Sequence, residues 1–178
     1  MSDLTAASSD AAVLTTPEPG TRHTGQGVTI TVAEPTLRLS LRARDAALLA
    51  SVTGLTLPTK IGDVTETAEG YALMLGPDEW VSLGTPANAT AGQPLAVVDI
   101  SSRALGFIVE GPRAEALLSA GCPQDLAKIT PGHGTRTIYE TVEIVLVRLT
   151  DGAAGPRWRV EVWRSFAAWL WGALVTAA

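Results

Sequence analysis

The chain has 178 residues, of which 46% are hydrophobic and 17% are charged; this composition favours a substantial folded core and excludes bulk disorder. Its formal net charge of -5 and its lack of any run of basic residues argue against a nucleic-acid partner. The longest apolar stretch, residues 166–178, is too short to span a bilayer, and the lone Cys122 cannot form an internal disulfide, so we expect a cytoplasmic protein with no membrane partner.

Residues 1–27 are rich in Ser, Thr, Ala, Gly and Pro and show no hydrophobic period. Such a composition predicts a flexible N-terminal tail, or an arm that orders only against a partner. Met1–Asp10 has neither the basic region nor the apolar core of a secretory signal. We therefore expect a single folded domain over residues 28–178.

The first half of this domain, residues 28–94, begins with a strand and a helix. Leucines alternate with polar neighbours over residues 36–42, which predicts a half-buried strand. Asp45 can then cap a helix that runs to Val52, with Gly54 in the position where helices end.

A β-hairpin follows in the same half. Residues 71–75 and 79–83 are strand-like, and between them Pro77 pre-sets the backbone for a turn in which Asp78 can bond its own main chain. Residues 85–94 are rich in Pro, Gly and Ala and are expected to form a loop.

The second half, residues 95–178, repeats this order. Strands are expected at 97–100 and 104–110, and Pro112 then starts a helix that ends at Gly121. The apolar residues expected on the inner face of that helix are Leu117 and Leu118.

The remaining elements of this half are two strands and a last helix. The β-branched stretch 137–149 should break near Thr141, turn at 151–156 and return as a strand over 158–163. Ser165 is expected to cap the last helix. The residues expected on its core face are Phe166, Trp169, Leu170, Ala173 and Leu174.

Strand, helix and hairpin thus occur twice, although residues 28–94 and 95–178 are not similar residue by residue. An antiparallel sheet with helices on one face would bury the apolar side of each half. We therefore predict an α+β fold with two similar halves, each built as such a sheet.

Several short motifs occur in a characteristic order and spacing. They are Leu75–Trp80 (LGPDEW), Val98–Ser101 (VDIS), Gly111–Ala114 (GPRA), Gly121–Leu126 (GCPQDL) and Arg164–Trp171 (RSF and a Trp-rich helix). Together they resemble the gamma subunit family of heterotetrameric sarcosine oxidase, from Leu75 to Leu174.

This resemblance implies a fold like the folate-binding domain of the glycine-cleavage T-protein. It also implies a non-catalytic structural subunit of a flavin-dependent oxidase or dehydrogenase that acts on sarcosine or another N-methyl amino acid. The chain would pack against the folate-binding region of the large subunit. Its partners would be the alpha, beta and delta subunits, which would hold FAD, FMN, NAD and tetrahydrofolate, with no cofactor in this chain.

No catalytic, cofactor-binding or metal-binding residue is predicted here. Gly25-Gln26-Gly27 lacks the third glycine of a dinucleotide fingerprint, and Pro131–Gly134 lacks the helix N-terminus that a phosphate cradle needs. His23, Cys122 and His133 do not have the paired spacing of zinc ligands. Cys122 is instead expected to be a small buried residue.

A free-standing protein of the same fold, which binds a folate-like molecule between its halves, is the alternative function. Asp99 lies in an apolar strand and could contact such a ligand. The favoured interpretation is a short turn in which the Asp99 carboxylate accepts hydrogen bonds from the amides of Ser101 and Ser102.

Trp163 and Trp171 are the candidate interface residues. Trp163 shares a strand face with Arg159 and Glu161, and Trp171 falls away from the apolar face of the last helix. Exposed tryptophan is uncommon on a monomer and enriched where proteins bind each other. A second packing layer within the chain explains the pattern equally well, and both alternatives stay open here.

Overall fold

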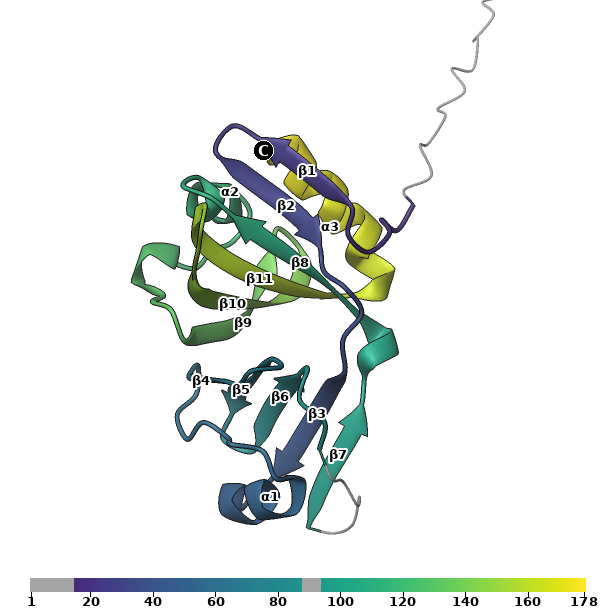
Figure 1. Cartoon of the computed structure of the whole chain (residues 1–178), viewed down its shortest axis with the longest axis vertical. Helices are drawn as coiled ribbons and strands as arrows, with labels where there is room; N and C mark the ends of the chain where they lie inside the picture. Colours follow the sequence, from purple (N-terminus) through teal and green to yellow (C-terminus); the bar gives the residue numbers. More distant parts are fainter. Residues whose placement is uncertain (1–14, 88–93) are drawn as a thin grey trace, which may run out of the picture.

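The structure, a computed structural model, describes residues 15–87 and 94–178. These residues form two antiparallel sheets, one of six strands in the order β1-β2-β8-β11-β10-β9 and one of five in the order β4-β5-β6-β3-β7 (Figure 1). The predicted α+β class with two antiparallel sheets is confirmed.

The larger sheet holds the main hydrophobic core. Its strands are β1 (Arg22–Gly25), β2 (Val28–Val32), β8 (Ala104–Glu110), β9 (His133–Tyr139), β10 (Val142–Gly152) and β11 (Gly155–Trp163). Helices α2 (Ala114–Ser119) and α3 (Arg164–Ala177) pack on one face of this sheet. Leu117 and Leu118 of α2 point into that core, as predicted, because they face the buried side of β11.

The smaller sheet has its own core on its outer face. Its strands are β3 (Arg38–Ala43), β4 (Val64–Glu66), β5 (Tyr71–Gly76), β6 (Glu79–Leu83) and β7 (Leu95–Asp99). Helix α1 (Ala46–Thr53) covers this core and is capped as predicted, since the Asp45 carboxylate accepts from the amides of Ala47 and Leu48. Gly54 ends the helix at φ 73°, a conformation that favours glycine.

The predicted hairpins are confirmed. β5 and β6 pair across the turn at Pro77 and Asp78. β9 and β10 pair around Glu140, which has a positive φ of 52° and produces the predicted break near Thr141. β10 and β11 form a further hairpin, in which β10, with most of the long β-branched stretch, lies between the edge strand β9 and the central β11.

The structure differs from the expected chain organisation in two places. Within residues 15–27, which were expected to be part of a tail, Arg22–Gly25 forms β1 and pairs with β2. The sheets also do not follow the boundary between residues 94 and 95, because β2 joins the larger sheet and β7 joins the smaller one. The rest of the predicted tail, 1–14, and of the predicted loop, 88–93, lies outside the described residues.

The last helix also differs from its prediction. α3 follows β11 with no linker, and no side chain caps it, so Ser165 lies inside its first turn. Its buried face consists of Ala167, Leu170 and Leu174, whereas the side chain of Phe166 is 46% exposed. The expectation that Trp171 lies away from the core is wrong, because its ring stacks on that of the buried Phe107, with 6.0 Å between centroids.

This stacking predicts that Trp171 supports the fold itself. Trp171→Ala should lower the free energy of unfolding of the isolated chain by roughly 1–3 kcal/mol, since it removes a partly buried ring and its aromatic partner. Urea unfolding would measure this loss, with the exposed Phe166→Ala as the matched control, for which about 0.5 kcal/mol or less is expected. Equal and negligible losses for the two variants would contradict the packing described for Trp171.

Candidate functional site

A cleft of ≈ 190 Å³ lies between the inner faces of the two sheets. Because strand residues alternate between faces, each sheet turns one set of side chains to its helices and the other set to this cleft. The smaller sheet contributes Leu75 and Val81, and the larger sheet contributes Val145 and Trp163. The cleft is therefore largely apolar, with charged groups at defined places.

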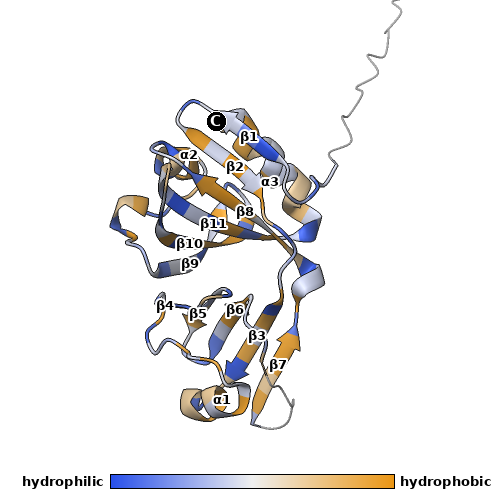
Figure 2. Cartoon of the chain, in the orientation of Figure 1, coloured by the Kyte–Doolittle hydropathy of each residue, from blue (hydrophilic) through white to orange (hydrophobic). Residues whose placement is uncertain are grey.

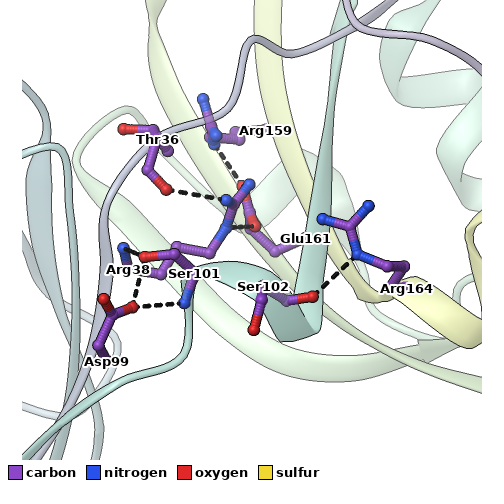
Figure 3. Close-up of polar contacts among 8 residues, drawn as sticks. All are labelled: Thr36, Arg38, Asp99, Ser101, Ser102, Arg159, Glu161 and Arg164. Atoms are coloured by element: carbon purple, nitrogen blue, oxygen red, sulfur yellow. Dashed lines mark hydrogen bonds and ion pairs between the residues drawn. The ribbon is translucent and has the colours of Figure 1, made fainter.

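A buried ion pair crosses between the sheets (Figure 3). Arg38 at the start of β3 is 4% exposed and Glu161 of β11 is 7% exposed. Arg38 donates from Nε to Glu161 Oε2 at 2.6 Å and from Nη2 to Glu161 Oε1 at 3.3 Å. Arg159 donates from Nε to Glu161 Oε1 at 2.6 Å, so one carboxylate serves two guanidinium groups.

Gly106 makes room for this cluster. It lies opposite Glu161 in the pairing of β8 with β11. A Cβ atom at this position would lie 2.5 Å from Glu161 Oε1 and 2.9 Å from Arg159 Nη2. The missing side chain of Gly106 thus allows the ion pair to fit between the sheets.

The phenol of Tyr71 lies buried near the same charges. Burial, reinforced by the negative charge of Glu161, raises the pKa of Tyr71 well above its usual range, so the hydroxyl stays protonated. Burial alone would lower the pKa of Arg159, but the Glu161 carboxylate keeps it above its usual value. The Tyr71 hydroxyl has no hydrogen-bond partner within residues 15–87 and 94–178, and Tyr71 lines the cleft.

Asp99 forms the predicted turn, although with Ser101 alone. The amide of Ser101 donates to Asp99 Oδ1 at 2.8 Å and the Ser101 hydroxyl donates to the same atom at 2.5 Å. These two bonds lower the pKa of Asp99. Because the Arg38 amide donates to the Ser101 hydroxyl at 2.9 Å, the turn holds the end of β7 against the start of β3.

Trp163 lies on the cleft-facing side of β11. It was predicted to share a strand face with Arg159 and Glu161, and Glu161 lines the same cleft. The guanidinium of Arg103 stacks over its ring, 4.4 Å from the centroid. Arg103 follows β7 by four residues and also lines the cleft. This stacked pair forms one border of the cleft.

A second set of charges crosses the sheets closer to solvent. Arg136 of β9 donates to Glu79 of β6 at 2.5 Å, and Arg42 of β3 lies 3.1 Å from the same carboxylate. The hydrogen bond from Arg136 lowers the pKa of Glu79. Glu79, like Glu161, is therefore paired with two arginine side chains in the cleft.

The other residues considered from sequence are not brought together. Cys122 is buried and its sulfur lies 3.9 Å from the Thr137 hydroxyl, whereas His133 contacts Thr130 and Asp63. In the part of the chain that the structure describes, no group of three His, Cys, Asp or Glu side chains could hold a metal ion. His23 lies in β1.

The two glycine-rich segments are turns. Gly27, with φ 75°, connects β1 and β2, and Gly132, with φ 83°, precedes β9. The second segment also joins the sheets, because Val64 donates its amide to Gly132 O at 2.9 Å and Gly134 donates to Gly62 O at 2.8 Å.

Sequence reasoning missed the Arg38–Glu161 pair. A signal was present, since each residue places a charge within a strand-like run, LRLSLRA and WRVEVW respectively. A charge in a strand that is buried on both faces needs a partner. Which partner it finds depends on how the sheets pack, because Arg38 and Glu161 are 123 residues apart in the sequence.

The chain is similar in sequence to curated gamma subunits of sarcosine oxidase. It is 36% identical over 89 residues to sarcosine oxidase subunit gamma from Arthrobacter sp and 34% identical over 114 residues to the subunit of that name from Corynebacterium sp. (strain U-96). These matches cover 45% and 57% of this chain and 44% and 56% of the relatives. The chain thus spans about half the length of the curated relatives it matches. No protein-family model matches the chain.

The fold is similar to that of a solved protein as well. The structure matches a chain of heterotetrameric sarcosine oxidase from Corynebacterium sp. U-96, solved in complex with pyrrole 2-carboxylate, with a TM-score of 0.75 and 26% identity. The match covers 88% of this chain and 86% of that one. The resemblance to the gamma subunit that the motifs indicate is confirmed. None of the helices described here is long and apolar enough to cross a membrane.

The buried ion pair generates a stability prediction. Glu161→Ala leaves the buried Arg38 and the partly buried Arg159 without a carboxylate and should lower the free energy of unfolding by about 3–5 kcal/mol. Glu79→Ala, which removes a carboxylate from the more exposed Arg136 and Arg42, is the matched control and should cost about 1 kcal/mol or less. Urea unfolding of both variants compares them, and similar losses would show that the Arg38 pair does not hold the sheets together.

The lowered pKa of Glu79 also predicts a dependence on pH. A carboxyl group with a folded-state pKa below its unfolded value adds stability above the unfolded pKa, and this contribution is lost as pH falls through the folded value. Glu79→Gln should therefore lower the thermal midpoint slightly at neutral pH and converge with the unchanged chain in acid. Calorimetric scans from pH 7 downward would measure it. A constant difference at every pH would exclude the ion pair as the cause.

Proposed function

We propose that this chain, a relative of sarcosine oxidase subunit gamma, is a non-catalytic structural subunit of a multi-subunit flavin-dependent oxidase or dehydrogenase. Its substrate would be sarcosine or another N-methyl amino acid. The observation that carries the proposal is the 0.75 TM-score to a chain of a heterotetrameric sarcosine oxidase over 88% of this chain. The names of the curated relatives support the same role.

The proposed partners are alpha, beta and delta subunits of such a complex in the cytoplasm. In this proposal FAD, FMN, NAD and tetrahydrofolate are held by the partners, and the chain packs against the folate-binding region of the large subunit. Of the two tryptophans considered, Trp163 is the one we place at a subunit interface. Its ring borders the cleft and carries the exposed Arg103, whereas Trp171 packs inward on Phe107.

The charges of the cleft support a structural role. Glu161 is held by two arginines and Glu79 by Arg136 and Arg42, so these carboxylates bind groups of the chain itself. Their contacts join the two sheets at two separate places. A body fixed in this way is suited to present surfaces to partners in a constant geometry.

A free-standing protein that binds a folate-like molecule between the sheets is the second candidate. One observation favours it, which is the unpartnered Tyr71 hydroxyl at the lining of the ≈ 190 Å³ cleft. The two functions differ in what the chain does alone. A structural subunit needs its partners to act, whereas a binding protein takes up its ligand as a monomer.

Purification of a tagged chain from its native host tests the proposal. We expect the larger subunits of the complex to co-purify in a fixed ratio, identified by mass spectrometry, together with a flavin absorption spectrum. The isolated chain, purified by itself, should be colourless and bind no flavin. A stable monomer that carries stoichiometric flavin, or a chain recovered without any larger subunit, would contradict the structural role.

A further inference from the structure

Each sheet has two edge strands, β1 and β9 in the larger sheet and β4 and β7 in the smaller. An open edge presents unpaired amide and carbonyl groups, and proteins protect such edges with charges, short strands or covering segments. Comparing the four edges shows which of them is open to another chain.

Two of the edges are short or covered, and a third, that of β9, is covered at its start. β1 has four residues, includes Arg22 and lies against Ala178 after α3, whose carbonyl would be 2.5 Å from a Cβ atom on Gly25. β4 has three residues. The loop before β4 and the start of β9 are joined by the amide of Gly134, which donates to Gly62 O at 2.8 Å.

The edge of β7 carries none of these protections in the part of the chain that the structure describes. Its sequence, Leu95–Asp99 (LAVVD), is apolar up to its last residue, as Figure 2 shows. The carboxylate of Asp99 is engaged by Ser101. The side chain of Val98 is 51% exposed.

The register of β7 identifies the groups that point outward. Ile100 donates its amide to Arg38 O at 2.9 Å, and Val98 lies opposite Ser40 on β3. Because antiparallel pairing alternates, Val98 turns its backbone groups toward β3, and Val97 and Asp99 turn theirs to the open edge. The Val98 side chain lies on the cleft-facing side of the sheet together with that of Ser40.

The charge beside this edge indicates what would bind there. Arg103, just after β7, is exposed and stacks on Trp163. Within residues 15–87 and 94–178 no carboxylate forms an ion pair with it. A segment laid along β7 could therefore place an acidic side chain on Arg103 and an apolar side chain on Val98.

We propose that β7 is a docking strand, to which a partner subunit adds an extended segment that hydrogen-bonds to the backbone of Val97 and Asp99. The segment carries an apolar residue that packs on Val98 and an Asp or Glu that pairs with Arg103. Strand addition of this kind takes its affinity from main-chain hydrogen bonds and its specificity from alternate side chains. The inference rests on the proposed function, because it assigns the surface through which the structural subunit binds a neighbour.

Val97→Pro tests the backbone contact directly. It removes an amide that points to the open edge while the pairing of β7 with β3 keeps its donors. Val98→Lys, a second variant, places a charge on the exposed apolar position. Each variant, tagged and co-expressed with the subunits that co-purify with the unchanged chain, should lower recovery of the complex by about tenfold or more.

Ile138→Lys is the matched control, since Ile138 is an apolar residue that is 42% exposed on a different edge strand, β9 of the larger sheet. It should leave recovery unchanged. Undiminished recovery with Val98→Lys, or an equal loss with Ile138→Lys, would overturn the proposal. If the unchanged chain recovers no partner subunit at all, the proposed function fails first and this inference fails with it.

Amide hydrogen exchange on the unchanged full chain provides a measurement that needs no variant. The amides of Val97 and Asp99 should exchange rapidly in the isolated chain and about tenfold or more slowly in the complex. Slow exchange in the isolated chain at every concentration would show that the chain covers its own edge. Slow exchange that depends on concentration would show a second copy there. Either result, or rapid exchange in the complex, would overturn the proposal.

Discussion

The buried contact between Arg38 and Glu161 is the constraint on which the arrangement of the two sheets depends. Each residue stands in a different sheet, and each is almost fully removed from solvent. Taking two charges out of water costs several kcal/mol per ion unless the geometry of the pair is good and the remaining hydrogen-bonding groups are satisfied. Arg38 meets that condition, because its Nε and Nη2 bind Glu161 and its Nη1 donates to Thr36 O at 3.1 Å. Arg159 adds one further hydrogen bond to Glu161, although its buried Nη2 has no partner within the described residues.

The features of the cleft follow from this contact. Gly106 must lack a side chain where Glu161 and Arg159 lie. The Ser101 hydroxyl binds the Arg38 amide and the Asp99 carboxylate together, so the segment that leaves β7 is tied to the start of β3. That segment carries Arg103 to the ring of Trp163. The ion pair, the Ser101 turn and the stacked Arg103 thus lie next to one another where β3 and β7 meet the larger sheet.

Local patterns in the sequence predicted the elements well. The Asp45 cap, the hairpin around Pro77 and the buried face of α2 each depend on a few neighbouring residues, and each is confirmed. The sequence did not show that β2, from the first half, joins the larger sheet or that β7, from the second half, joins the smaller one. Pairing between strands far apart in sequence leaves no local pattern. The face of α3 was misjudged for a related reason, since the sheet beneath it decides which side is buried.

The candidate site shows the same division. The turn at Asp99 and the burial of Cys122 were predicted from local chemistry, and the resemblance to the gamma subunit was predicted from short motifs. The cleft, the ion pair and the stacked Arg103 arise only when the two sheets come together. Burial of charge between sheets is a property of tertiary packing, and residue spacing alone does not encode it.

An electron cryo-microscopy map of the complex purified from the native host would test the central claim most directly. The account predicts that this chain lies in an assembly with larger subunits, that all cofactor density lies in those subunits, and that a neighbouring strand runs along β7. Density for a folate-like or flavin molecule between the two sheets of this chain, without a neighbouring subunit on its surface, would contradict it.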